Sequence, residues 1–66
     1  MTKVHNGIEY KGGERVFATG NAAGGIQRGT VVGFTKGGQF RVLIDADACC
    51  RAGEIIRTHW VSPLNA

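Results

Sequence analysis

The sequence is poor in the features that anchor a protein in a membrane or direct it out of the cell. Its 66 residues contain no apolar run near the roughly 20 residues that a membrane-spanning helix needs. The N-terminal stretch, MTKVHNGIEYKGG, also lacks the apolar segment of a secretory signal peptide. We therefore expect a cytoplasmic protein that contacts no membrane.

Cysteine is scarce, and its placement excludes a disulfide framework. The two cysteines, Cys49 and Cys50, are adjacent, and a bridge between neighbours closes a strained ring. The only histidines, His5 and His59, stand at no metal-ligand spacing from them. We predict two reduced thiols, as a reducing cytosol permits, and neither a metal nor another cofactor.

Charge is also modest. Eight Lys and Arg residues against five Asp and Glu residues give a net charge of +3, and no two basic residues are neighbours. A dedicated polyanion binder carries dense Lys and Arg clusters. Any basic surface of this protein must therefore be assembled by folding.

The chain is short enough that stability itself constrains the interpretation. We expect one domain covering residues 1–66, with residues 1–9 either adding an edge strand or remaining a loose arm. Ordering such a chain costs on the order of 100 kcal/mol, which a core this small offsets only narrowly. Homo-oligomerisation is therefore expected before any motif is considered.

What the sequence has in abundance is glycine, at 11 residues against a single proline. The glycines bound short segments rich in β-branched and aromatic residues, and no window shows apolar residues at helical spacing. We predict an all-β fold whose strands cover residues 14–18, 29–35, 39–45 and 54–61, with a short fifth strand near Trp60 and Val61.

Alternation within these segments predicts which side chains face inward. The stretch FTKGGQF indicates an antiparallel hairpin that turns at residues 36–38. Gly33, in the first strand of this hairpin, lets the sheet bend. Trp60 is expected in the core, because a small barrel needs a large side chain to fill it. The remaining predicted core residues are Val16, Val31, Phe40, Val42, Ile44 and Ile56.

Together the glycines, valines and strand order resemble the small SH3-like barrels, and the first part resembles a KOW-type motif. That motif opens a strand after Lys-Gly and places Gly-x-Val at the start of the next. Lys11-Gly12, Val16, Gly25 and Gly29-Thr30-Val31 occupy those places. The resemblance covers roughly residues 10–64. It implies about five short antiparallel strands, closed by a short helical turn and a last strand in HWVSPLNA.

The glycine-rich stretch TGNAAGGIQRG, residues 19–29, invites comparison with a phosphate-binding loop. A Walker loop needs Lys-Ser/Thr after its last glycine and then a helix. Here Ile26 follows Gly25, and a strand comes next. We interpret this stretch as a long connection between the first two strands of the barrel, with ligand contact as the alternative.

KOW-like barrels commonly hold RNA or DNA through loops and one sheet face, so the resemblance implies nucleic-acid binding. Either His59 or Trp60 is a candidate for stacking a base, and we expect such binding to be weak and salt-sensitive. The candidate phosphate contacts are Arg28, Lys36, Arg41 and Arg57.

The alternative is a protein-interaction or homo-oligomeric assembly module. Three apolar residues, Phe17, Val32 and Leu43, have no obvious place inside one small barrel, and self-association would bury them. Small stand-alone barrels of this kind also occur among accessory proteins of phages, plasmids and other mobile elements. That resemblance implies a modulator of a host protein.

A third hypothesis is enzymatic. GERV, GTVVGF and the closing strand resemble the plasmid-encoded type II dihydrofolate reductases, which are tetrameric SH3-like barrels with a central pore. That family's pore carries a Val-Gln-Ile-Tyr run, whereas IIRTHW stands here. Ile56 matches an apolar pore residue, but the glutamine and the tyrosine are missing.

No catalytic constellation is evident from the residues themselves. Asp45 and Asp47 are spaced to share a face, as a general acid/base pair would, but such residues more often cap a turn. Cys49 or Cys50 with His59 would be a nucleophile pair in principle. We therefore expect a binding module rather than an enzyme.

Overall fold

The computed structural model describes residues 2–20 and 24–64, and within these ranges the chain forms strands and no helix. The prediction of an all-β fold is confirmed. It follows that no described segment is a helix long and apolar enough to cross a membrane. The strands are β1 (Lys3–His5), β2 (Ile8–Tyr10), β3 (Arg15–Ala18), β4 (Gln27–Phe34), β5 (Phe40–Ile44), β6 (Ile55–Thr58) and β7 (Val61–Pro63).

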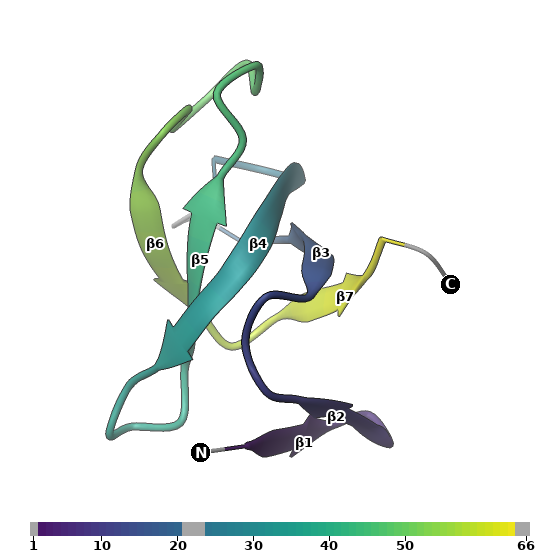
Figure 1. The fold of residues 1–66 in the computed structure, drawn as a ribbon. Helices are drawn as coiled ribbons and strands as arrows, with labels where there is room; N and C mark the ends of the chain where they lie inside the picture. Colours follow the sequence, from purple (N-terminus) through teal and green to yellow (C-terminus); the bar gives the residue numbers. More distant parts are fainter. Residues whose placement is uncertain (1, 21–23, 65–66) are drawn as a thin grey trace.

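The strands form two antiparallel sheets (Figure 1). Five of them lie in the order β6-β5-β4-β3-β7, with the long strand β4 at the centre, and β1 and β2 form a separate hairpin. Among the described residues β6 and β7 each pair with one neighbour only, so the ladder does not close on itself. The result is a small, barrel-like arrangement of short strands.

The β4–β5 hairpin turns at the predicted place. The Thr35 N–H donates to the Gln39 carbonyl at 2.9 Å, and the Gly38 N–H donates back to the Thr35 carbonyl at 3.1 Å. Gly38 has φ +85°, which glycine reaches without strain. The register shifts between Val31 and Gly33, and such a bulge bends its strand.

The core lies on the inner face of the five-stranded sheet. The six predicted core residues other than Trp60 are all buried, which confirms that alternation placed them on the inner face. Tyr10, Ala18 and Val61 complete the cluster. Tyr10 is the largest of the buried side chains, and it comes from the N-terminal hairpin rather than from the main sheet.

Two strand boundaries differ from the prediction. Strand β4 begins at Gln27 rather than Gly29, because Gln27 and Arg28 still pair with the end of β3. The segment 54–61 breaks after Thr58, whose hydroxyl donates to the Thr19 carbonyl at 2.9 Å and accepts from the Trp60 N–H at 3.1 Å. These bonds hold a turn between β6 and β7, and no helical turn forms at that point in the described chain.

Trp60 is not a core residue. Its side chain is 62% exposed, so the expectation that it fills the barrel is wrong. Alternation places it inward only if the strand continues past Thr58, and the turn there breaks the alternation. Tyr10 and Phe40 occupy the interior instead, with their ring centroids 5.0 Å apart.

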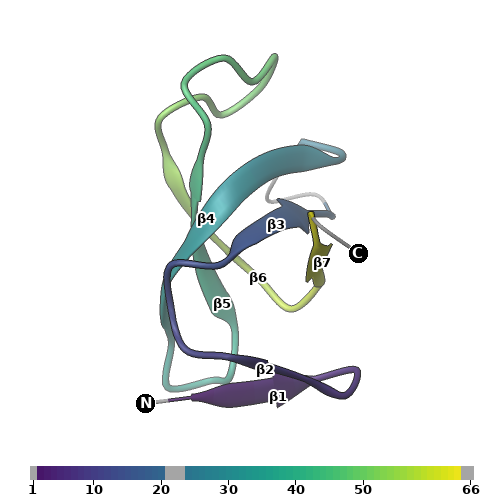
Figure 2. The same ribbon diagram turned by 45° about the vertical axis from the view of Figure 1, so that its right-hand side comes forward.

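The N-terminal segment, expected over residues 1–9 as an edge strand or a loose arm, forms a hairpin of its own over residues 3–10. Asn6 and Gly7 have φ values of 51° and 79°, as a two-residue hairpin turn requires. Figure 2 shows this hairpin at the end of the molecule that also carries the β4–β5 turn. The His5 ring meets the Phe40 ring edge-on at 5.4 Å, which docks the hairpin against the main sheet.

Candidate functional site

Charged side chains differ between the two ends of β5. Beyond its C-terminal end, the β5–β6 loop (residues 45–54) carries three carboxylates, and each is paired with an arginine. The pairs are Arg15–Asp45 at 2.6 Å, Arg51–Glu54 at 3.6 Å and Arg28–Asp47 at 4.0 Å. This loop lies at the top of Figure 1. Because each of its carboxylates faces an arginine, the charges there largely cancel.

The opposite end of β5 carries cations without a paired carboxylate. Within the described part of the chain, four basic residues near the β4–β5 turn make no ion pair. The Lys3 ammonium lies 5.6 Å over the centroid of the Phe40 ring and close to Gly38 in the turn. We call this group the cationic end: Lys3, Lys36, Arg41 and Arg57.

Arg41 and Arg57 are directly opposite one another across β5 and β6. Like charges in that position repel and destabilise a sheet. Arg41 also extends across β4, since a Cβ placed on Gly33 would lie 3.8 Å from Arg41 Cδ. Both side chains are exposed, and each guanidinium group offers N–H donors suited to a phosphate.

His59 and Trp60 follow β6 at the same end of the sheet, because Thr58 pairs with Phe40 at the start of β5. Both side chains are exposed, and their rings meet edge-on with centroids 5.8 Å apart. Trp60 comes three residues after Arg57, so their Cα atoms are within about 11 Å. The pairing of β5 with β6 therefore brings Lys36, Arg41 and Arg57 to one end of these strands, with His59 and Trp60 on the turn that follows β6.

Arg28 does not join this group. It lies near the start of β4, opposite Phe17 of β3, and its guanidinium reaches Asp47 in the β5–β6 loop. Lys3, by contrast, belongs to the cationic end although sequence analysis did not select it. The Asn6-Gly7 pair was the signal available, because it predicts a hairpin that folds residues 3–5 back onto the protein.

The three apolar residues predicted at an interface separate in the structure. Val32 and Leu43 are exposed on the outer face of the sheet, and Ile55, which pairs with Leu43, is exposed beside them. We call Val32, Leu43 and Ile55 the outer apolar patch. Phe17 is half-buried and lines a pocket on another part of the surface. The exposure of Ile55 follows from alternation within β6, because Ile55 lies two residues before Arg57 and therefore on the same outward face.

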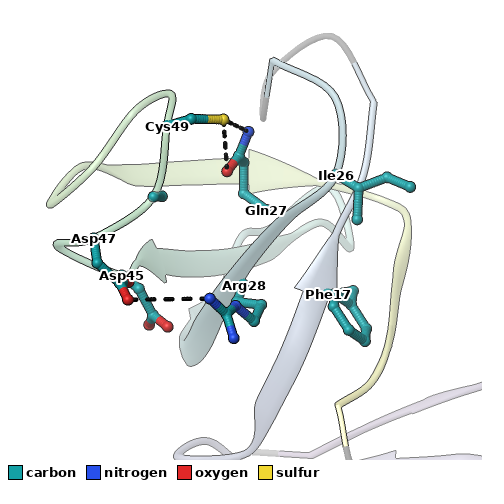
Figure 3. Close-up of a pocket in the computed structure, with 8 residues that line it drawn as sticks. Phe17, Ile26, Gln27, Arg28, Asp45, Asp47 and Cys49 are labelled. Atoms are coloured by element: carbon teal, nitrogen blue, oxygen red, sulfur yellow. Dashed lines mark hydrogen bonds and ion pairs between the residues drawn. The ribbon is translucent and has the colours of Figure 1, made fainter.

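The pocket beside Phe17 has a volume of about 260 Å³ and lies between β3, β4 and the β5–β6 loop (Figure 3). Buried Gln27 donates from Nε2 to Cys49 Sγ at 3.5 Å. This contact, with the neighbouring Cys50 thiol, lowers the pKa of Cys49, while the Cys49 side chain raises the pKa of Cys50. Both thiols are free and exposed.

The candidate catalytic groups are not brought together. The cysteines lie in the β5–β6 loop and His59 lies beyond the far end of β6, so they form no nucleophile pair. Asp45 binds Arg15 through both carboxylate oxygens, and Asp47 faces Arg28. Across residues 2–20 and 24–64, no three His, Cys, Asp or Glu side chains gather in a group that could hold a metal.

The glycine-rich stretch 19–29 is a connection between β3 and β4 over its described part, and residues 21–23 lie outside the described residues. Its last three residues belong to β4.

No protein-family model, curated protein or solved structure matches the chain. Its function is therefore inferred from the chemistry of its own residues.

Proposed function

We propose that this protein is a non-catalytic binding module whose cationic end holds the sugar-phosphate backbone of a nucleic acid. The observation that carries the proposal is the juxtaposition of Arg41 and Arg57. They stand opposite one another on neighbouring strands and make no ion pair within the described chain. A phosphate placed between them relieves their repulsion and accepts hydrogen bonds from both.

The rest of the charge distribution supports the same end of the molecule. Lys3 and Lys36 flank the arginines at the hairpin and the turn, while the carboxylates of the β5–β6 loop lie at the far end of β5. Glu9, on β2, pairs with Val4 rather than with Lys3, so it lies on the other face of the hairpin. A polyanion is therefore attracted to the cationic end.

Binding through so few cations is expected to be weak and strongly dependent on salt. Nonspecific complexes have dissociation constants of roughly 10⁻⁴ to 10⁻⁶ M at physiological salt. Each phosphate contact to a single strand contributes a slope of about −0.7 to the plot of log K against log salt concentration. Two arginine contacts therefore account for a slope of about −1.4.

The test is a fluorescence-anisotropy titration of a labelled oligonucleotide, single-stranded and duplex, over a series of salt concentrations. Replacing both arginines, as R41Q/R57Q, is expected to weaken binding and to make the salt slope about 1.4 less steep. The matched control is R28Q/R51Q, which removes the same charge from the other end of the molecule and keeps binding close to that of the unmodified chain. Equal losses in the two variants, or no binding at low salt, would contradict the proposal.

The outer apolar patch favours a second candidate function, self-association. Val32, Leu43 and Ile55 expose 44%, 39% and 51% of their surfaces on adjacent strands, and burying them against a second copy would enlarge a small core. Sedimentation velocity over a range of protein concentrations tests this. A concentration-dependent dimer lost in L43Q/I55Q, but retained in V4Q, supports it, and a monomer throughout excludes it.

A further inference from the structure

The side chain of Trp60 is unusually placed for a tryptophan. It is the only tryptophan in the chain, and most of its surface is exposed, although tryptophan is highly buried on average. Trp60 belongs neither to the core nor to the outer apolar patch. Single-stranded nucleic acids bind where bases stack on an aromatic ring while cations follow the backbone, and Trp60 comes three residues after Arg57, on the turn that follows β6.

The backbone of Trp60 is fixed even though its ring is exposed. Its N–H donates to Thr58 Oγ1 at 3.1 Å, and its carbonyl accepts from the Thr19 N–H at 3.1 Å. These bonds tie the turn between β6 and β7 to the end of β3. The indole is therefore held on an anchored turn, which limits the entropy lost when a base stacks on it.

The immediate neighbours of the indole leave it accessible. The His59 ring meets it edge-on, with an angle of 82° between the planes. On another side lies Gly20, where a Cβ would be 3.8 Å from Trp60 Cε3. Gly20 has φ +103°, a conformation that favours glycine, so this position contributes no side chain that would cover the ring.

We infer that the ligand of the cationic end is a single-stranded nucleic acid, with one unpaired base stacked on Trp60 and the adjoining phosphates on Arg41 and Arg57. This inference rests on the proposed function and names its substrate class. In a duplex each base is already stacked and paired, so its face is not available to an indole. In a single strand it is available, and the short separation of Arg57 from Trp60 lets neighbouring nucleotides fill both positions.

The intrinsic fluorescence of the protein tests the inference directly, because every tryptophan signal comes from Trp60. The probes are oligothymidine, oligouridine and a duplex with the same number of phosphates. We expect both single strands to quench the fluorescence saturably and the duplex to leave it nearly unchanged. Quenching by either single strand supports the inference, and the tighter of the two names the source of the ligand.

Substitution separates stacking from charge. W60A is expected to weaken single-strand binding by roughly 5- to 150-fold, since base–aromatic stacking contributes about 1–3 kcal/mol per base, while leaving duplex binding unchanged. W60F keeps an aromatic surface and is expected to retain most of the affinity. Because Trp60 is exposed, both variants should fold, and circular dichroism verifies this.

The failure of this inference is distinguishable from failure of the proposed function. Loss of binding in R41Q/R57Q shows that the cationic end binds nucleic acid. If W60A then weakens single-strand and duplex binding equally, or changes neither of them, stacking on Trp60 is excluded while the proposed function stands. If neither single strand nor duplex binds at low salt, the proposed function fails, and this inference fails with it.

Discussion

Phe40 connects the N-terminal hairpin to the five-stranded sheet. Its ring is fully buried and meets Tyr10 and His5 of the N-terminal hairpin edge-on, while Phe34 packs against it from the adjacent strand. Lys3 lies over the same ring. Aromatic pairs at these distances contribute about 0.5–1.5 kcal/mol beyond their buried area. One side chain thus joins the hairpin to the core and positions a cation at the turn.

The Tyr10 hydroxyl is buried without a hydrogen-bond partner in the described structure. Burial raises the pKa of this phenol, with a smaller contribution from Glu14. An unsatisfied buried hydroxyl costs about 1–3 kcal/mol, so Tyr10→Phe is expected to leave the free energy of unfolding unchanged or to increase it. Chemical denaturation measures this, and a clear loss of stability would show that the hydroxyl has a partner in solution.

Asp45 makes the best-formed ion pair of the described chain, with both carboxylate oxygens accepting from Arg15 at 2.6 Å. These hydrogen bonds lower the pKa of Asp45 from its ordinary value of 3.8. A carboxyl with a lower pKa in the folded state stabilises the fold above its unfolded pKa, and this stabilisation is lost as pH falls through the folded pKa. Asp45→Asn is therefore expected to lower the melting temperature at neutral pH, with the difference shrinking below pH about 4.

The matched control for Asp45 is Asp47→Asn. Its pair with Arg28 is longer, at 4.0 Å, and more exposed, and such surface pairs contribute little. Thermal unfolding followed by circular dichroism at several pH values compares the two variants. Equal effects at neutral pH would mean that the bidentate geometry of Asp45 adds nothing.

At the scale of elements, β4 depends on close backbone approach to β5. A Cβ on Gly29 would lie 2.6 Å from the Leu43 carbonyl oxygen and 2.7 Å from Val42 Cγ1. The backbone oxygen cannot move aside without disturbing the ladder. Gly29→Ala is therefore expected to destabilise the fold by about 1–3 kcal/mol through overpacking, as measured by urea denaturation.

The control for Gly29 is another glycine on the same hairpin. A Cβ on Gly37 would meet only Thr35 Oγ1, at 3.8 Å, an ordinary contact. Gly37→Ala is therefore expected to change stability by less than about 0.5 kcal/mol. A similar loss in both variants would indicate that chain flexibility, rather than the contact with Leu43, explains the glycine at position 29.

Alternation within single strands predicted most of the main sheet. Phe40, Val42 and Ile44 are buried as expected because a strand with one face inward fixes each second residue. The same rule misplaced Trp60, since side-chain bonds of Thr58 end the strand before it. Strand pairing moved the start of β4 to Gln27, and pairing between distant segments is not visible in a local pattern.

The candidate site was less predictable than the core. Arg41 and Arg57 were both selected from the sequence, but their juxtaposition depends on the register between β5 and β6, which the sequence alone leaves undetermined. The Arg28–Asp47 pair likewise needed coordinates, because it joins β4 to a loop that follows the next strand. Lys3 reaches the turn only through the docking of the N-terminal hairpin.

At the scale of the whole molecule, charge and exposed apolar surface occupy different regions. The paired charges gather around the β5–β6 loop, and the cationic end lies around the β4–β5 turn. The outer apolar patch lies on the sheet face between them. A polyanion and a second copy of the chain would therefore bind to adjacent surfaces. Arg41 and Arg57 border both, so the two proposed interactions are expected to influence one another.

The separate ladder of β1 and β2 has a consequence for motion. Within the described residues this hairpin shares no strand pairing with the five-stranded sheet, and contacts with the Phe40 ring hold it there. Such a unit can detach locally at a lower free energy than global unfolding. We expect amide protons of the β1–β2 ladder to exchange with solvent faster than those of Val31 and Val42, as followed by NMR; uniform protection would mean that the whole chain opens as one cooperative unit.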